Sequence, residues 1–547
     1  MILRSFERVA VYFLVTLGLL AIPLAVIAMM GSGLGWDART DAGQSIAIRE
    51  VIPQLPPGTD LQVAYDQIYL TAEFYGILIP QLADILHFFI SGSTEMLQMN
   101  DMATYKLQGM ATILIATLGA AALGVASASA LKSRLAGSFT WALIMLMPIY
   151  FGMSYVNIKD MPVAAGLSLL SAGLILNRST ESTFMRWVCA TVFWVLGASI
   201  ALATRPGLWP LLLLFSLGNL SLFAVHDLRK GNLHRSRPGV AGLLAATFGS
   251  LTLLWWSNPF GRLALFPWLM DSFSVMRAYP WQGSIRTAGQ DVLSTDLPWW
   301  YVPAWVLAQL PILTTLLASI GFVVIAASIL RRQWSLPTHR VFNLVPVVTQ
   351  ALFLPLAIIL SGAILYDAVR HLLFLFPALA AVASVTIAFL QYRSTSQRLV
   401  FRNMAALTAV LVVTVSTWAT LRWMPYSYAF INPIAGWNQP KLDWELDYWG
   451  VSAYEGVERL KERSYGYIAT LPTEETSSIY GAGSLENTVK ASGSNPYGLY
   501  VFNRWDFNIG DCTPLFAIKR DGQILGEGAE CRNPSASILD HRSLPND

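Results

Sequence analysis

Long apolar runs are the feature that most constrains how this chain can fold. Runs long enough to cross about 30 Å of bilayer hydrocarbon occur eleven times. The first has about twenty apolar residues and ends without a small-x-small cleavage site, so it is interpreted as a retained anchor and not a signal peptide. The predicted spans are 10–30, 111–131, 138–155, 162–176, 187–203, 207–225, 239–257, 302–330, 342–365, 371–391 and 403–420.

The composition indicates the same class and excludes others. Of the 547 residues, 54% are apolar and 13% are charged, as expected for an integral membrane protein. A net charge of +3 argues against a nucleic-acid partner, which would require a concentrated basic face. Three cysteines and six scattered histidines, without CxxC or HExxH, give no metal-ligand cluster.

Basic residues in alternate loops predict the orientation. They favour a cytoplasmic N-terminus, and the acidic residues then lie mainly outside. The residues placed on the cytoplasmic side are Arg4, Arg8, Lys132, Arg134, Arg178, Arg186, Arg229, Lys230, Arg235, Arg237, Arg331, Arg332, Arg340, Arg393, Arg398 and Arg402.

Two outside loops are too long to be simple connectors. Residues 31–110 form the first, in which 77–90 is apolar but too short and too polar to span, so we expect an interfacial helix. Residues 258–301 form the second, which is rich in Pro and Trp. Its tryptophans are either anchors in the membrane's aromatic belt or part of a lid that faces substrate.

The composition changes after Leu421, where residues 422–547 become polar. Residues 1–421 are therefore predicted to form the transmembrane core, followed by a small C-terminal extracytoplasmic α/β domain. Within it, residues 516–525 read as a β-hairpin around an Asp-Gly turn. Cys512 and Cys531 flank this hairpin and are predicted to pair in an oxidising compartment.

Asp37 stands directly after the first apolar run, in the stretch Gly35-Trp36-Asp37-Ala38-Arg39-Thr40-Asp41. A carboxylate close to the bilayer surface is costly to desolvate, which makes Asp37 a candidate catalytic group. Alternatively, Asp37 and Asp41 are solvated loop acids, with Asp41 capping a helix that starts near residue 42.

Six short motifs follow the predicted topology in order, and together they resemble bacterial integral-membrane glycosyltransferases of the GT-C class. That class includes the protein O-mannosyltransferases and the lipid A aminoarabinose transferase. The motifs are 157–162 (NIKDMP), 202–207 (LATRPG), 296–301 (DLPWWY), 366–371 (YDAVRH), 425–432 (PYSYAFIN) and 445–450 (ELDYWG).

This resemblance implies transfer of a sugar from a polyprenyl-phosphate donor on the outer face of the membrane. The acidic residue that acts as base in the family falls on Asp37, while Asp160 matches the acidic position of the second outside loop. The family often has Glu after the first acid, where this chain has Ala38, so Asp41 stays open as a partner in catalysis. One carboxylate that takes the acceptor's proton during direct displacement gives inversion.

The leaving phosphate requires cations, and four residues at the outside ends of spans are candidates for binding it: Arg370, His371, Arg205 and Lys159. Three of these residues, and Asp160, have structural alternatives. Arg370 and His371 could be interfacial anchors, and Arg205 could cap the carbonyls of the fifth span. Asp160 could form a salt bridge with Lys159 or cap the fourth span.

The predicted function is therefore a glycosyltransferase of the bacterial inner membrane that acts on an extracytoplasmic glycan, lipid or protein. Metal dependence stays open: Arg and Lys can serve a monophosphate leaving group, but a divalent cation could bind if Asp37, Asp41 and Asp160 converge. A transporter or a flippase of lipid-linked sugars is an alternative, although its ionisable groups would lie near the membrane midplane. A non-catalytic scaffold with the same fold is another.

Overall fold

The computed structural model describes residues 2–56, 58–68, 74–178, 184–231, 237–277, 279, 281–330, 336–392, 398–437, 443–472, 475–493, 495–503 and 512–532. Within these ranges nine helices are long and apolar enough to span a membrane, or ten if one bent helix pair counts as a span. The predicted cytoplasmic residues Arg235, Arg331, Arg332 and Arg393 lie outside the described residues.

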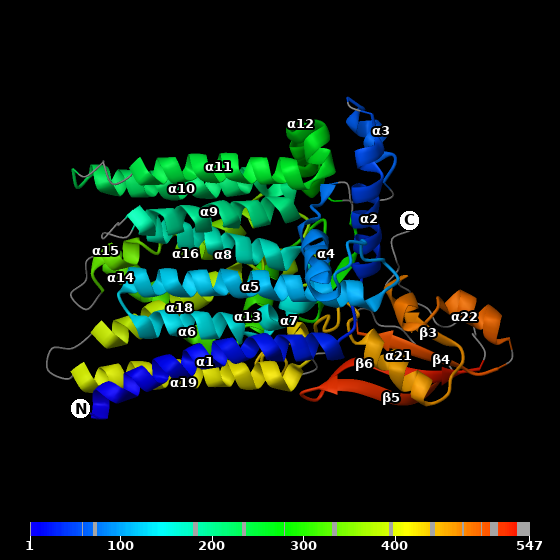
Figure 1. Ribbon diagram of the computed structural model, residues 1–547. Helices are drawn as coiled ribbons and strands as arrows, with labels where there is room; N and C mark the ends of the chain where they lie inside the picture. Colours follow the sequence, from blue (N-terminus) through cyan, green and yellow to red (C-terminus); the bar gives the residue numbers. More distant parts are fainter. Residues whose placement is uncertain are drawn as a thin grey trace.

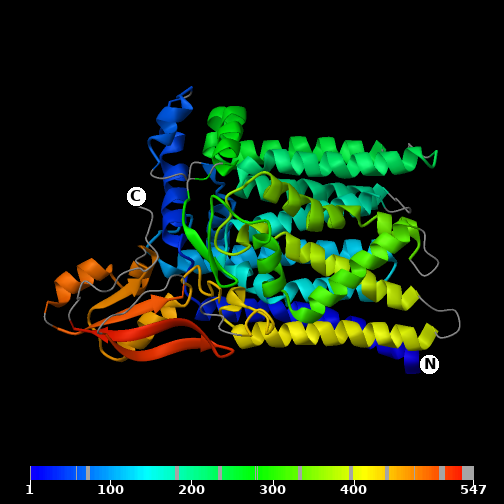
Figure 2. The ribbon, with the colours of Figure 1, turned by 180° about the vertical axis from the view of Figure 1, so that it is seen from behind.

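The membrane core is a bundle of long helices. Figures 1 and 2 show these helices running in the same general direction, with the first and last of them side by side. The nine are α1 (Ile2–Gly31), α5 (Met102–Leu131), α8 (Asp160–Asn177), α9 (Phe184–Thr204), α10 (Trp209–Leu228), α11 (Arg237–Ser257), α14 (Ile312–Ile329), α18 (Leu375–Tyr392) and α19 (Arg398–Trp423).

Three of the eleven predicted spans are interrupted. The run 138–155 is a helix pair, α6 (Arg134–Met145) and α7 (Pro148–Val156), bent by 55°. The run 302–330 is divided into α13 (Tyr301–Gln309) and α14, because Pro311 is extended and cannot donate a helix hydrogen bond. The run 342–365 contains a shorter apolar helix, Val345–Leu360, made of α16 (Val345–Val348), a π-turn and α17 (Leu354–Leu360).

Both of the long loops predicted to lie outside contain regular structure. The first is shorter than predicted, because α5 starts at Met102, where the side chain of Asp101 caps the helix. Its segment 77–90 forms a helix as predicted. The elements of the two loops are α2 (Ala38–Glu50), α3 (Leu61–Tyr65), α4 (Leu78–Ser91), α12 (Pro259–Arg277), β1 (Ser284–Thr287) and β2 (Gln290–Leu293).

The C-terminal part contains a four-stranded sheet in the order β3-β4-β6-β5, covered by short helices. Strands β3 and β4 are parallel, and the other pairs are antiparallel. The hairpin β5–β6 turns at Asp521 and Gly522, which both have positive φ. The elements are α21 (Ala453–Glu462), β3 (Ile468–Leu471), α22 (Leu485–Ser492), β4 (Tyr497–Phe502), β5 (Thr513–Arg520) and β6 (Gln523–Cys531).

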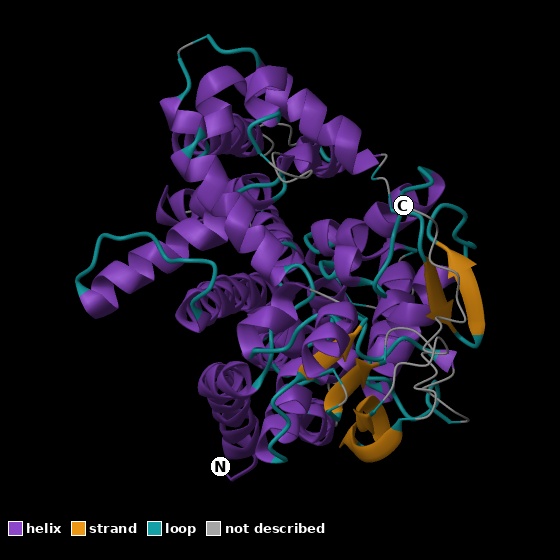
Figure 3. Cartoon of the chain, turned by 90° about the vertical axis from the view of Figure 1, so that its right-hand side faces the viewer, coloured by secondary structure: helices purple, strands orange, loops and turns teal. Residues whose placement is uncertain are grey.

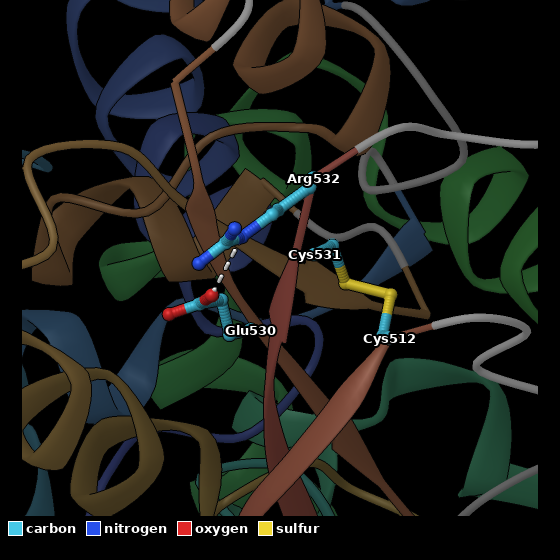
Figure 4. Close-up of a disulfide and its surroundings, with 4 residues drawn as sticks. All are labelled: Cys512, Glu530, Cys531 and Arg532. Atoms are coloured by element: carbon cyan, nitrogen blue, oxygen red, sulfur yellow. Dashed lines mark hydrogen bonds and ion pairs between the residues drawn. A yellow bond between two sulfur atoms is a disulfide. The ribbon is translucent and has the colours of Figure 1, made fainter.

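Cys512 and Cys531 are joined by a disulfide at the open end of this hairpin, next to an ion pair between Glu530 and Arg532 (Figure 4). The sheet lies at one end of the helix bundle, together with α2 and α3, and the N-terminus lies at the opposite end (Figures 1 and 2). Figure 3 views the molecule from the end that carries the sheet, so the bundle helices are seen nearly end-on behind the strands. The two long loops and the C-terminal sheet therefore meet at one end of the bundle.

Candidate functional site

Asp37 is the N-cap residue of α2, at the point where the chain leaves α1. Its side chain is 38% exposed, and its carboxylate lies 3.8 Å from a guanidinium nitrogen of Arg370. It is more exposed than the other two candidate acids, Asp41 and Asp160. A carboxylate in this position is accessible to an incoming hydroxyl group.

Asp160 starts α8 and is buried. One of its oxygens accepts a hydrogen bond from Arg205 at 2.5 Å, and the other accepts from the Asn157 side chain at 3.0 Å. The Asn157 side chain also accepts from the backbone N–H of Asp160, at 2.7 Å. The salt bridge to Lys159, one of the alternatives considered for Asp160, is not formed, because Lys159 pairs with Asp41 and Arg205 pairs with Asp160.

Arg370 is buried between the two acids, with a nitrogen 3.8 Å from both Asp37 and Asp160. Asp367 holds the guanidinium at 3.1 Å. Both Asp367 and Ala368 adopt left-handed backbone with φ of 55° and 57°. Such strain in consecutive non-glycine residues is costly and persists where a site requires a particular backbone path.

Two aromatic rings also lie against the Arg370 guanidinium, Tyr366 at 4.7 Å and Trp449 at 5.2 Å. Burial alone would lower the pKa of Arg370, but the neighbouring carboxylate of Asp367 holds this pKa well above its ordinary value. Arg370 therefore stays charged and fixed. This arrangement is not that of a side chain that snorkels to lipid head groups.

Asp41 and Lys159 form a separate ion pair at 2.5 Å, one helical turn along α2 from Asp37. Burial raises the pKa of Asp41 to about 6, and Lys159 offsets only part of that effect. Lys159 also lies over the ring of Tyr75, at 4.4 Å. Asp41 is thus neither a solvated loop acid nor a cap, and Lys159 is engaged with a carboxylate.

A cavity of about 490 Å³ begins beside Asp160 and extends between α8, α10, α12 and α17. Its polar end contains Asp160, Arg205 and His371, and most of the remaining wall is apolar. A long hydrocarbon chain with an anionic head matches this distribution. Further polar residues at the same end are Tyr75, Arg277, Tyr279 and Tyr366, and apolar wall residues include Val163, Leu167, Leu208, Leu211, Phe273, Ile358, Ile364 and Phe374.

His371 differs from the arginines in its charge. Burial and the neighbouring guanidinium of Arg370 lower the pKa of His371 well below its ordinary value, so the imidazole is neutral at working pH. It can offer a hydrogen bond to a phosphate, but it does not supply the positive charge that sequence reasoning assigned to it.

Within the second long loop, residues 258–301, some aromatic residues lie beside the cavity and others are exposed like anchors in the membrane's aromatic belt. Trp281 stacks on Tyr366 at 4.6 Å, and Tyr279 stacks on the same ring at 6.0 Å, so this part borders the cavity like a lid. Trp268 is fully buried in the core. Trp299 is 75% exposed, as expected for a membrane-belt anchor.

The three candidate acids lie beside cations, and among the described residues no group of three His, Cys, Asp or Glu side chains is arranged to hold a metal ion. Asp41 is paired with Lys159, and Asp160 is paired with Arg205. Asp37 faces Arg370. Asp41 and Asp160 thus each have a close cation, and Arg370 is shared between Asp37 and Asp160.

Sequence reasoning missed several residues that the fold brings to the site. Asp367 precedes Arg370 by three residues within a recognised motif, and that spacing was an available signal. Tyr75 and Arg277 border the cavity from segments that carried no motif. Trp449 lies in the last motif, but nothing in the sequence connected that motif to Arg370.

Comparisons with known proteins identify the fold by structural similarity and not by sequence. No family model matches the sequence, and no curated protein matches it. The structure is similar to ArnT from Cupriavidus metallidurans bound to undecaprenyl phosphate, at a TM-score of 0.50 and 11% identity over 98% of this chain and 99% of that one. At this identity the similarity concerns the fold alone, and the chain has the fold of the GT-C membrane glycosyltransferases.

Two further solved structures are similar over much of the chain. The Archaeoglobus fulgidus oligosaccharyltransferase in its apo form aligns at a TM-score of 0.49 and 11% identity, covering 87% of this chain and 65% of that one. The arabinofuranosyltransferase AftD from Mycobacteria aligns at 0.37 and 12%, covering 96% and 40%.

Proposed function

We propose that this protein is a membrane glycosyltransferase that moves a sugar from a polyprenyl-phosphate donor to an extracytoplasmic glycan, lipid or protein. The observation that carries the proposal is the position of Arg370. This buried cation lies 3.8 Å from the accessible carboxylate of Asp37 and 3.8 Å from Asp160, which borders the amphipathic cavity. A candidate base and a candidate lipid site are thus adjacent.

The donor is assigned to the cavity. Its apolar walls suit a polyprenyl chain, and Arg205 at its polar end can present a second N–H to a phosphate oxygen while it remains paired with Asp160. The Nε of Arg205 is buried and has no hydrogen-bond partner within the described residues. The bound undecaprenyl phosphate of the similar ArnT structure supports the same lipid class.

Asp37 is assigned the role of base. The acceptor hydroxyl oxygen attacks the anomeric carbon, the bond from that carbon to the phosphate oxygen breaks, and the hydroxyl proton passes to the Asp37 carboxylate. The polyprenyl phosphate leaves with an additional negative charge, which the fixed guanidinium groups of Arg205 and Arg370 stabilise. One displacement of this kind inverts the anomeric centre.

The location of the charged groups of the site favours a glycosyltransferase over a transporter. They gather at the end of the bundle that carries the outside loops and the C-terminal sheet, whereas transporters place such groups near the midplane. We place the protein in the bacterial inner membrane, with its N-terminus in the cytoplasm and its C-terminal domain outside. Basic residues in alternate loops support that orientation.

The test measures cleavage of the bond between sugar and phosphate in the donor. It uses vesicles that contain the purified protein, with protein-free vesicles as control. A panel of polyprenyl-phosphate sugars, labelled in the sugar, is supplied together with extracted envelope material as acceptor. The proposal predicts that one donor releases polyprenyl phosphate and that its label enters the acceptor. Movement of the intact donor between leaflets, without cleavage of any donor, would establish a flippase instead.

A further inference from the structure

Two of the six motifs, 425–432 and 445–450, lie at the head of the C-terminal region, and the proposed chemistry does not use them. Within them, Tyr428 donates a hydrogen bond to the buried carboxylate of Asp447. The backbone of Tyr428 also packs against Gly152 of α7, where an added Cβ would come within 2.2 Å of the Tyr428 nitrogen. The first motif therefore fixes the second against the membrane core.

The second motif forms a tight turn around Asp447. Its carboxylate accepts from the backbone N–H groups of Val451 and Ser452, both at 3.1 Å. Gly450 adopts left-handed backbone with φ of 66°. Trp449, which directly precedes Gly450, lies in this turn.

Trp449 contacts both halves of the candidate site. Its carbonyl accepts from the backbone N–H of Trp36 at 2.9 Å, next to Asp37. Its ring lies 5.2 Å from the Arg370 guanidinium. The loop that carries Asp37 approaches the same ring closely, since a Cβ added to Gly35 would come within 2.8 Å of it.

We propose that Trp449 is a positioning residue, which makes the C-terminal region a part of the glycosyl-transfer site. Its backbone fixes the loop of Asp37, and its ring fixes Arg370. Trp449 is buried, and its indole N–H has no hydrogen-bond partner within the described residues. Its position is therefore explained by its backbone contact with Trp36 and its ring contact with Arg370, and not by a hydrogen bond from the indole. This inference rests on the proposed function.

The first test is Trp449→Leu, which removes the ring over Arg370. Loss of this cation–π contact should raise the Kd for polyprenyl phosphate roughly two- to thirtyfold, with a fall in kcat. Trp449→Phe keeps an aromatic face and should restore most of both. Trp444→Phe is the matched control, because Trp444 lies in the same segment and donates to the carbonyl of Ala435.

A second variant perturbs the Trp449 ring from the loop that carries Asp37. Gly35→Ala should displace the ring and reproduce the Trp449→Leu pattern, while Gly31→Ala should behave as wild type because nothing lies within 4 Å of its added Cβ. Wild-type Kd and kcat in both Trp449→Leu and Gly35→Ala would overturn the inference. So would a loss that accompanies lower thermal stability in detergent and is not restored by Trp449→Phe.

Failure of this inference is distinguishable from failure of the proposed function. If Asp37→Asn abolishes transfer and Trp449→Leu does not alter it, only the role of Trp449 is wrong. If Asp37→Asn transfers normally, the proposed function of the site is wrong, whatever Trp449 does. The Kd for polyprenyl phosphate is measured independently of turnover.

Discussion

Arg205→Lys is the sharpest test of the donor site, because it keeps the charge and removes the guanidinium fork. Arg205 borders the cavity, pairs with Asp160 at 2.5 Å and retains a buried Nε without a partner in the described part of the chain. A lysine can still neutralise Asp160, but it cannot pair with Asp160 and offer a second fixed N–H to the phosphate. We therefore expect a loss of donor affinity without a loss of folding.

The magnitude follows from one lost charged hydrogen bond, about 1.5–3 kcal/mol. At about 1.4 kcal/mol for each factor of ten, the Kd for polyprenyl phosphate should rise roughly ten- to a hundredfold. Arg205→Ala is a poorer variant, because it leaves the buried Asp160 without its close cation at a cost of about 3–5 kcal/mol in folding stability.

The assay is equilibrium binding of polyprenyl phosphate to purified protein in lipid nanodiscs, with thermal unfolding measured in parallel. Arg422→Lys is the matched control, because Arg422 pairs with Asp521 at 2.6 Å, is 47% exposed and does not line the cavity. Equal Kd values for wild type and Arg205→Lys, with both proteins folded, would refute the assignment of the phosphate to Arg205.

Three further predictions concern other parts of the molecule. Asp41, whose pKa burial raises to about 6, takes up a proton as the pH falls through that value and loses its ion pair with Lys159, so transfer should decline below about pH 6. A pH–rate profile of Asp41→Asn should lack that step, and an identical step in the variant would exclude Asp41 as its source. Reduction of the Cys512–Cys531 disulfide, which closes a loop with a sequence separation of 19, should destabilise the C-terminal sheet by about 3 kcal/mol; mass spectrometry that finds both thiols free in unreduced protein would contradict the pairing. In a Cys189→Ser background, a cysteine at Trp437, which is 83% exposed, should label from outside and one at Gly231 should not, and the reverse pattern would invert the proposed orientation.

Much of the fold follows from the sequence because membrane spans obey a strong physical rule. Backbone polar groups in hydrocarbon must be paired within the segment, so long apolar runs become helices. Breaks within an apolar run are harder to predict. A hydropathy profile does not register that Pro311 lacks a backbone N–H to donate, nor does it register the π-helical turn within Val345–Leu360. The structure divides these runs into shorter helices, so that nine helices of the described residues, or ten with the bent pair, have the length and hydropathy of a span.

Part of the candidate site can be predicted from the sequence as a list of residues, but the pairs that these residues form cannot. The structure brings Asp37, Asp160 and Arg370 within 3.8 Å contacts, although they come from three separate loops. Sequence adjacency suggested that Lys159 pairs with Asp160, whereas the start of α8 directs them to different partners, Asp41 and Arg205. Partner choice depends on which loops meet in space, and a single sequence does not determine that. The catalytic roles of these residues stay predictions.

Asp37→Asn tests the central claim most directly. The change keeps the size of the side chain and removes the proton acceptor, so transfer from bound polyprenyl-phosphate sugar in a single turnover should fall by roughly two to four orders of magnitude, while the Kd for polyprenyl phosphate stays near that of the wild type. Asp60→Asn in the same outside loop is the control, because Asp60 caps α3 and asparagine caps helices equally well. Transfer by Asp37→Asn at a rate close to that of the wild type and of Asp60→Asn would contradict the assignment of Asp37 as the base.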